Sequence, residues 1–79
     1  KAPVLVLKDA DLEAAVQAIA FGAFANQGQI CMSTERVVVE EPVADALVEG
    51  LARKATSLPV GDPRQGPVAL GCLVDPKAT

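Results

Sequence analysis

The sequence contains no histidine, tryptophan or tyrosine, and only two of its 79 residues are cysteine. These absences exclude the ligand sets of zinc fingers and the paired thiols of disulfide-dense scaffolds. One bridge between Cys31 and Cys72 is formally possible, but nothing else in the sequence indicates a secreted protein. We therefore expect two free thiols and a cytoplasmic protein.

Clusters of basic residues and long apolar runs are also absent. Seven basic and ten acidic residues are dispersed along the chain and give a net charge of −3. A nucleic-acid-binding surface would instead show grouped Lys and Arg. No apolar run approaches the roughly 20 residues that span a bilayer, and no signal peptide is visible. We expect neither nucleic acid nor membrane as a partner.

The length and the apolar content together favour part of a larger domain. The chain is shorter than most domains, which run to roughly 100–150 residues. Its apolar fraction is 51%, mostly Ala, Val and Leu. A self-sufficient mini-protein more often relies on large side chains, disulfides or a metal. We expect at most one domain, which packs against something outside these residues.

The first half of the chain has the pattern of a strand followed by a helix. Residues 2–7 form a continuous apolar run, which is typical of a parallel strand covered on both faces. Residues 11–26 have apolar side chains at helical spacing, and Asp9 or Asp11 can cap the helix. The polar face is short and Ala-rich, which predicts burial on more than one side. Gly28 can adopt a positive φ and end the helix.

The second half repeats this pattern and then changes character. Residues 36–40 predict a strand, and a helix is expected from Glu41 to about position 58, with Pro42 in its first turn. Its expected buried stripe comprises Val43, Ala46, Leu47, Gly50, Leu51, Ala55 and Leu58. Residues 59–79 are rich in Gly and Pro and predict a loop or extended tail with little structure of its own.

The predicted fold class is therefore α/β, with a β-α-β-α unit over residues 1–58 and a tail over 59–79. Such a unit usually belongs to a parallel sheet. Two strands alone do not make a stable open sheet. The remaining strands must come from a parent protein or from another copy of the chain, so we expect self-association of the isolated chain.

The segment around Cys31 is the most informative stretch. The run Asn26-Gln27-Gly28-Gln29-Ile30-Cys31 places a thiol after a polar, glycine-containing turn between helix and strand. A nucleophilic cysteine needs its thiolate form, and the backbone N–H of such a loop can bind a developing oxyanion. A lone cysteine can equally be a small buried apolar residue. Spacing alone leaves both interpretations open.

This run resembles the active-site cysteine motif of the NAD(P)-dependent aldehyde dehydrogenases. The resemblance continues in order and spacing over essentially the whole chain, through four further segments: Lys1-Ala2-Pro3 after a Glu-Leu-Gly-Gly-Lys motif, residues 9–16, Gly61-Asp62-Pro63, and residues 71–75. Residues 28–36 look closest to the branch that includes benzaldehyde, vanillin and salicylaldehyde dehydrogenases. The implied fold is a β-α-β-α fragment of the aldehyde dehydrogenase catalytic domain.

The resemblance implies a catalytic role for Cys31 and a reaction that turns an aromatic aldehyde into a carboxylic acid through a thiohemiacetal and a thioester. The cofactor of the parent enzyme would be NAD or NADP. In the family, the general-base glutamate lies just before the position of Lys1, and the oxyanion-hole asparagine and most of the nucleotide site lie elsewhere. No glycine-rich dinucleotide fingerprint occurs here. We expect no cofactor binding and no activity from this chain alone.

Residues near Cys31 have simpler interpretations. We interpret Asn26 as helix-terminating, Cys72 as incidental, Met32 as packing and Glu35 as solvated or ion-paired. Lys1 has no reliable role. Gln29 could shape the approach to Cys31 or simply satisfy backbone groups, and the sequence favours neither. A non-enzymatic, self-associating module derived from the same domain is the alternative to an enzyme segment.

Overall fold

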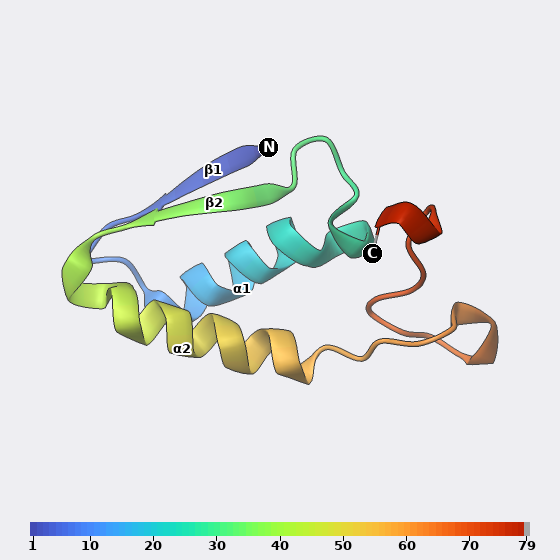
Figure 1. The fold of residues 1–79 in the computed structure, drawn as a ribbon. Coiled ribbons are helices and arrows are strands. Elements are labelled where there is room, and N and C mark those ends of the chain that lie inside the picture. Colours follow the sequence, from blue (N-terminus) through green and yellow to red (C-terminus); the bar gives the residue numbers. More distant parts are fainter. Residues whose placement is uncertain (79) are drawn as a thin grey trace.

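The computed structural model describes residues 1–78, which form two strands and two long helices in the predicted β-α-β-α order. The α/β class is therefore confirmed. Along the chain (Figure 1) the elements are β1 (Ala2–Val6), α1 (Leu12–Phe24), the 3-10 turn η1 (Ala25–Gly28), β2 (Thr34–Val39), α2 (Glu41–Ser57), and the short 3-10 turns η2 (Pro63–Gln65) and η3 (Pro76–Ala78).

The two strands pair in parallel, as the sequence predicted. Val4 lies opposite Val37 and Val6 opposite Val39, and α1 forms the crossover between the strands. The register shifts between Ala2 and Pro3. Proline has no N–H to give to the ladder, so it suits an irregular position at the start of a strand.

Local sequence explains where the helices begin. The Asp11 carboxylate accepts a hydrogen bond from Ala14 N at 3.2 Å and caps α1, as one of the two predicted candidates. Pro42 lies in the first turn of α2, where a missing N–H costs nothing. Helix α1 ends at Phe24, two residues earlier than expected, because the chain turns into η1 there.

Both helices pack on the same face of the sheet (Figure 1). The core lies between them and consists of Val6, Ile19 and Leu47, which are 3%, 5% and 1% exposed. Seven partly buried apolar residues pack around it: Val4, Leu12, Ala15, Val16, Val37, Val39 and Leu51.

The opposite face of the sheet is open within residues 1–78, so the second cover expected for it would come from outside these residues. Leu5 is 64% exposed and Val38 is 51% exposed, because all helices among residues 1–78 lie on the other side. Phe21 of α1 is likewise 77% exposed, so residues 1–78 do not themselves bury this helix on several sides. In α2, Ala46 and Ala55 fall at the exposed edges of the predicted stripe.

The C-terminal tail has more structure than its Gly and Pro content predicted. Val60 and Leu70 form an isolated parallel bridge, with Gly61 N donating to Leu70 O and Leu70 N donating to Pro59 O, each at 3.0 Å. The tail thus folds back on itself and returns toward the end of α1 (Figure 1).

Candidate active site

Cys31 lies on a tight corner between η1 and β2, and its side chain is exposed. Ser33 N donates to Ile30 O at 2.9 Å, which makes Cys31 and Met32 the two central residues of a four-residue turn. None of the described residues accepts a hydrogen bond from the Cys31 N–H. The exposed thiol therefore lies on the same residue as a backbone donor that has no partner among the described residues.

Ser33 holds this corner, and the sequence analysis missed it. Its side chain is 3% exposed, and its Oγ accepts a hydrogen bond from Ile30 N at 3.2 Å. Its carbonyl accepts from Ala2 N at 3.0 Å and so joins the corner to β1. The available clue was a serine two residues after Cys31, since short hydroxyl side chains bond locally to turn backbone.

Three consecutive residues before the corner have left-handed backbone. Their φ angles are 53° at Asn26, 59° at Gln27 and 76° at Gly28. The positive φ at Gly28 was predicted, and Asn tolerates this region better than most residues. The positive φ at Gln27 was not predicted, because glutamine has no special preference for it. This run reverses the chain after α1 and directs it toward β2.

Local side-chain hydrogen bonds hold the left-handed run. Gln29 N and Nε2 both donate to Asn26 O, at 3.0 and 3.3 Å, and Asn26 Nδ2 donates to Gln29 O at 3.5 Å. Lys1 Nζ donates to Gly28 O at 2.5 Å. Gln29 thus satisfies backbone groups, which was one of its two open interpretations, while Asn26 lies two residues after the end of α1.

The tail contacts this loop through two glutamine side chains. Gln27 Oε1 accepts from Gly71 N at 3.2 Å, while Gln27 Nε2 donates to Cys72 O at 3.1 Å. Gln29 Oε1 accepts from Val74 N at 2.9 Å. The loop that carries Cys31 is therefore bonded to residues more than 40 positions further along the chain.

The remaining residues near the corner behave in part as predicted. Glu35 forms an ion pair with the α-amino group of Lys1. The hydrogen bond and positive charge of that amino group hold the pKa of the Glu35 carboxyl below its usual range. Met32 is 75% exposed, so the packing role expected for it is wrong within this chain. Cys31 and Cys72 are both free thiols.

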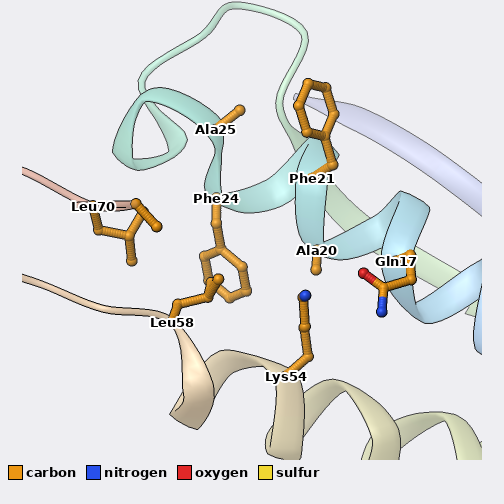
Figure 2. Close-up of a pocket in the computed structure, with 9 residues that line it drawn as sticks. Gln17, Ala20, Phe21, Phe24, Ala25, Lys54, Leu58 and Leu70 are labelled. Atoms are coloured by element: carbon orange, nitrogen blue, oxygen red, sulfur yellow. The ribbon is translucent and has the colours of Figure 1, made fainter. Parts of the chain in front are cut away.

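A separate hollow of about 300 Å³ lies between the C-terminal ends of the two helices and the tail (Figure 2). Its lining is mostly apolar, with the Phe24 ring beside Leu58 and the amino group of Lys54 directed toward Ala20. Cys31 does not line it. The hollow and the nucleophile candidate are therefore different places in the molecule.

Comparison with known proteins identifies the family. The family model described as "Aldehyde dehydrogenase family" matches residues 1–79. The chain belongs to the aldehyde dehydrogenase family. It is 64% identical over 78 residues to vanillin dehydrogenase of Pseudomonas fluorescens, covering 99% of this chain and 16% of that protein. It is 48% identical over 79 residues to salicylaldehyde dehydrogenase of Pseudomonas putida, with 99% and 16% covered.

Solved aldehyde dehydrogenases contain the same fold. A salicylaldehyde dehydrogenase from Pseudomonas putida G7, crystallised with salicylaldehyde, matches with a TM-score of 0.93 and 51% identity, covering 99% of this chain and 16% of that one. Lactaldehyde dehydrogenase from Escherichia coli matches with a TM-score of 0.93 and 38% identity, covering 99% and 17%. The chain thus spans about one sixth of the length of these relatives.

Neither of the two long helices among residues 1–78 has an N-terminus suited to a diphosphate. Helix N-termini bind diphosphates when neutral backbone N–H groups face the ligand. Here Asp11 and Glu13 occupy the start of α1, and Glu40 and Glu41 that of α2, so both ends present carboxylates that repel phosphate.

Among residues 1–78, no helix is long and apolar enough to cross a membrane.

Proposed function

We propose that these residues are the nucleophile-bearing segment of an NAD(P)-dependent enzyme that oxidises aromatic aldehydes to carboxylic acids, with Cys31 as the nucleophile. The observation that carries this proposal is the exposed Cys31 thiol at the centre of a tight turn, beside its own unpaired N–H. The similarity of the chain to vanillin and salicylaldehyde dehydrogenases supports the aromatic substrate class.

The chemistry assigned to this chain is the first step. The thiolate of Cys31 attacks the aldehyde carbon, a carbon–sulfur bond forms, and the carbonyl π electrons move to oxygen as an oxyanion. The Cys31 N–H is placed on the same residue as the sulfur and can donate to that oxyanion. Loss of one such donor in other enzymes costs about 2.7–4 kcal/mol of transition-state stabilisation.

Later steps need groups that the described residues do not supply. NAD(P)+ would accept the hydride in the oxidation of the adduct, and a base would activate water for thioester hydrolysis. Among residues 1–78 no carboxylate forms a hydrogen bond with Cys31. We therefore propose that the 79-residue chain alone does not reduce NAD(P)+ in the presence of benzaldehyde.

A chimeric enzyme tests the role of Cys31. Residues 1–79 would replace the matching segment of the Pseudomonas fluorescens vanillin dehydrogenase, to which they are 64% identical. We expect the chimera to oxidise vanillin with NAD+, Cys31→Ser to abolish turnover, and Cys72→Ser to leave it within about twofold. Retention of turnover by C31S, with the nucleotide and aldehyde saturating, would refute the assignment.

We also propose that the isolated chain associates with itself, which is the alternative, structural role open to it. The open face of the two-stranded sheet presents Leu5 at 64% and Val38 at 51% exposure, and each strand has an unpaired edge. Unpaired edges and exposed apolar faces favour pairing with another chain.

Sedimentation at several concentrations tests the association. We expect the unsubstituted chain to sediment as more than a monomer, and Val38→Lys to shift it toward monomer because a charge then interrupts the apolar face. Lys substitution of Val48, which is 63% exposed on α2 rather than on the sheet, serves as the matched control. A monomer at all concentrations, or equal effects of both variants, counts against the proposal.

A further inference from the structure

The left-handed run before Cys31 needs support from outside itself. Asn26 and Gln27 both have positive φ, a conformation that side-chain-bearing residues adopt at an energetic cost. Such residues persist only where surrounding contacts determine their geometry. The bonds between Asn26 and Gln29 are confined to the loop, so they cannot fix its orientation relative to the rest of the chain.

Besides the bond from Lys1 Nζ to Gly28 O, this support comes from residues 71–74, which we name the C-terminal segment. The Gln27 side chain forms two hydrogen bonds with it: Oε1 accepts from Gly71 N at 3.2 Å, and Nε2 donates to Cys72 O at 3.1 Å. Gln29 adds a bond to Val74 N at 2.9 Å. Together these side chains bond to two backbone N–H groups and one backbone carbonyl of the C-terminal segment.

Gly71 lies close to Pro63 and Gln27, with room for a Cβ at ordinary van der Waals distance. A Cβ placed at Gly71 would lie 3.7 Å from the Pro63 ring and 4.0 Å from Gln27 Nε2. Ordering a glutamine side chain costs rotamer entropy. Because the side-chain oxygen and nitrogen of Gln27 are both hydrogen-bonded, these bonds must stabilise the fold by more than that entropy cost. The contact joins two segments more than 40 residues apart, which a purely local loop would not require.

We propose that Gln27 and Gln29 are positioning residues, which use the C-terminal segment to fix the loop that presents Cys31. This proposal rests on the proposed function only in assigning catalysis to Cys31. The positioning itself concerns only the backbone order of the loop that carries Cys31. A misplacement of about 1 Å at a reacting group can cost roughly a hundredfold in rate, so such a support has a catalytic consequence.

Two NMR measurements on the complete 79-residue chain test the positioning, with Gln27→Leu/Gln29→Leu as the variant. We expect the Gly71 amide to be protected from hydrogen exchange, and to exchange about threefold to tenfold faster in the variant, as fits the loss of one hydrogen bond. We expect the backbone order parameters of Gly28 and Cys31 to fall from about 0.85 toward 0.6. Gln65→Leu is the control, because Gln65 lies exposed in the same tail and its side chain makes no hydrogen bond among residues 1–78.

Steady-state kinetics in the vanillin dehydrogenase chimera then separate positioning from a purely structural role. We expect Q27L/Q29L to lower kcat at least tenfold while KM stays within about twofold, and Q65L to change neither. An unprotected Gly71 amide in the unsubstituted chain overturns the proposal. So does an unchanged order parameter at Cys31, or an unchanged kcat, in the double variant. If Cys31 were not the nucleophile, C31S would stay active while the NMR results stood.

Discussion

Gly22 of α1 lies directly against Thr34, the first residue of β2. A Cβ atom at position 22 would stand 2.5 Å from Thr34 Oγ1 and 3.5 Å from Thr34 Cβ. The glycine thus lets the helix approach the strand at the point where the chain leaves the Cys31 corner. This contact links the packing of α1 to the placement of the loop.

Gly22→Ala is expected to destabilise the chain despite the better helix propensity of alanine. Overpacking of this kind costs about 1–3 kcal/mol, against a propensity gain of about 1 kcal/mol. In a Thr34→Ala background the clash is removed, so the same substitution should stabilise by about 0.5–1 kcal/mol. Urea unfolding at fixed chain concentration measures all four variants. Equal effects in both backgrounds would show that the contact carries no energy.

Gly28 is expected to resist substitution for a conformational reason. Its φ is 76°, and a Cβ there would lie 3.1 Å from Ala23 O. Alanine in left-handed backbone costs roughly 1–2 kcal/mol, so Gly28→Ala should lower the free energy of unfolding by at least that amount. Gly61→Ala is the control, because Gly61 has no positive φ and its nearest neighbour, Val68 Cγ1, would be 3.4 Å away. Equal losses in the two variants would contradict the conformational explanation.

Sequence patterns predicted the elements well because each depended on nearby residues. The Asp11 cap, the apolar spacing of α1, and Pro42 at the start of α2 are local features, and all three were found. The left-handed run before Cys31 was predicted incompletely. Gly28 was expected to have positive φ, but Gln27 was not, because contacts with Gly71 and Cys72 accompany its conformation.

Burial was predicted less well because it depends on what covers each face. The apolar run over residues 2–7 predicted two covered faces, but among residues 1–78 only one face of β1 meets a helix layer. Met32 was expected to pack for the same reason and is exposed. Ser33 was missed because its importance lies in the buried bond to Ile30 N, which composition does not reveal.

Leu47 should carry a large part of the chain's stability. It is 1% exposed and lies in the core with Val6 and Ile19. Leu47→Ala removes buried carbon and leaves a cavity, which typically costs about 2–5 kcal/mol. Val48→Ala, one position along α2 but 63% exposed, should change the free energy of unfolding by less than about 0.5 kcal/mol. Chemical denaturation followed by circular dichroism compares them, and similar losses would mean that this core does not form.

Arg64 is expected to set the titration of Asp62 in the tail. Its guanidinium donates to Asp62 Oδ1 at 3.1 Å and to Asp62 Oδ2 at 2.7 Å, and together with the Arg64 backbone N–H it lowers the pKa of the Asp62 carboxyl. A lowered pKa in the folded chain means that the pair stabilises the fold above the unfolded pKa of about 3.9, and that this stabilisation is lost as pH falls through the folded value.

Arg64→Met should raise the Asp62 midpoint toward its ordinary value, measured by carbon-13 NMR of the carboxyl. Arg53→Met, which breaks only the exposed pair with Glu49, should leave the Asp62 midpoint unchanged. A midpoint that R64M does not move would mean that the ion pair is not populated in solution.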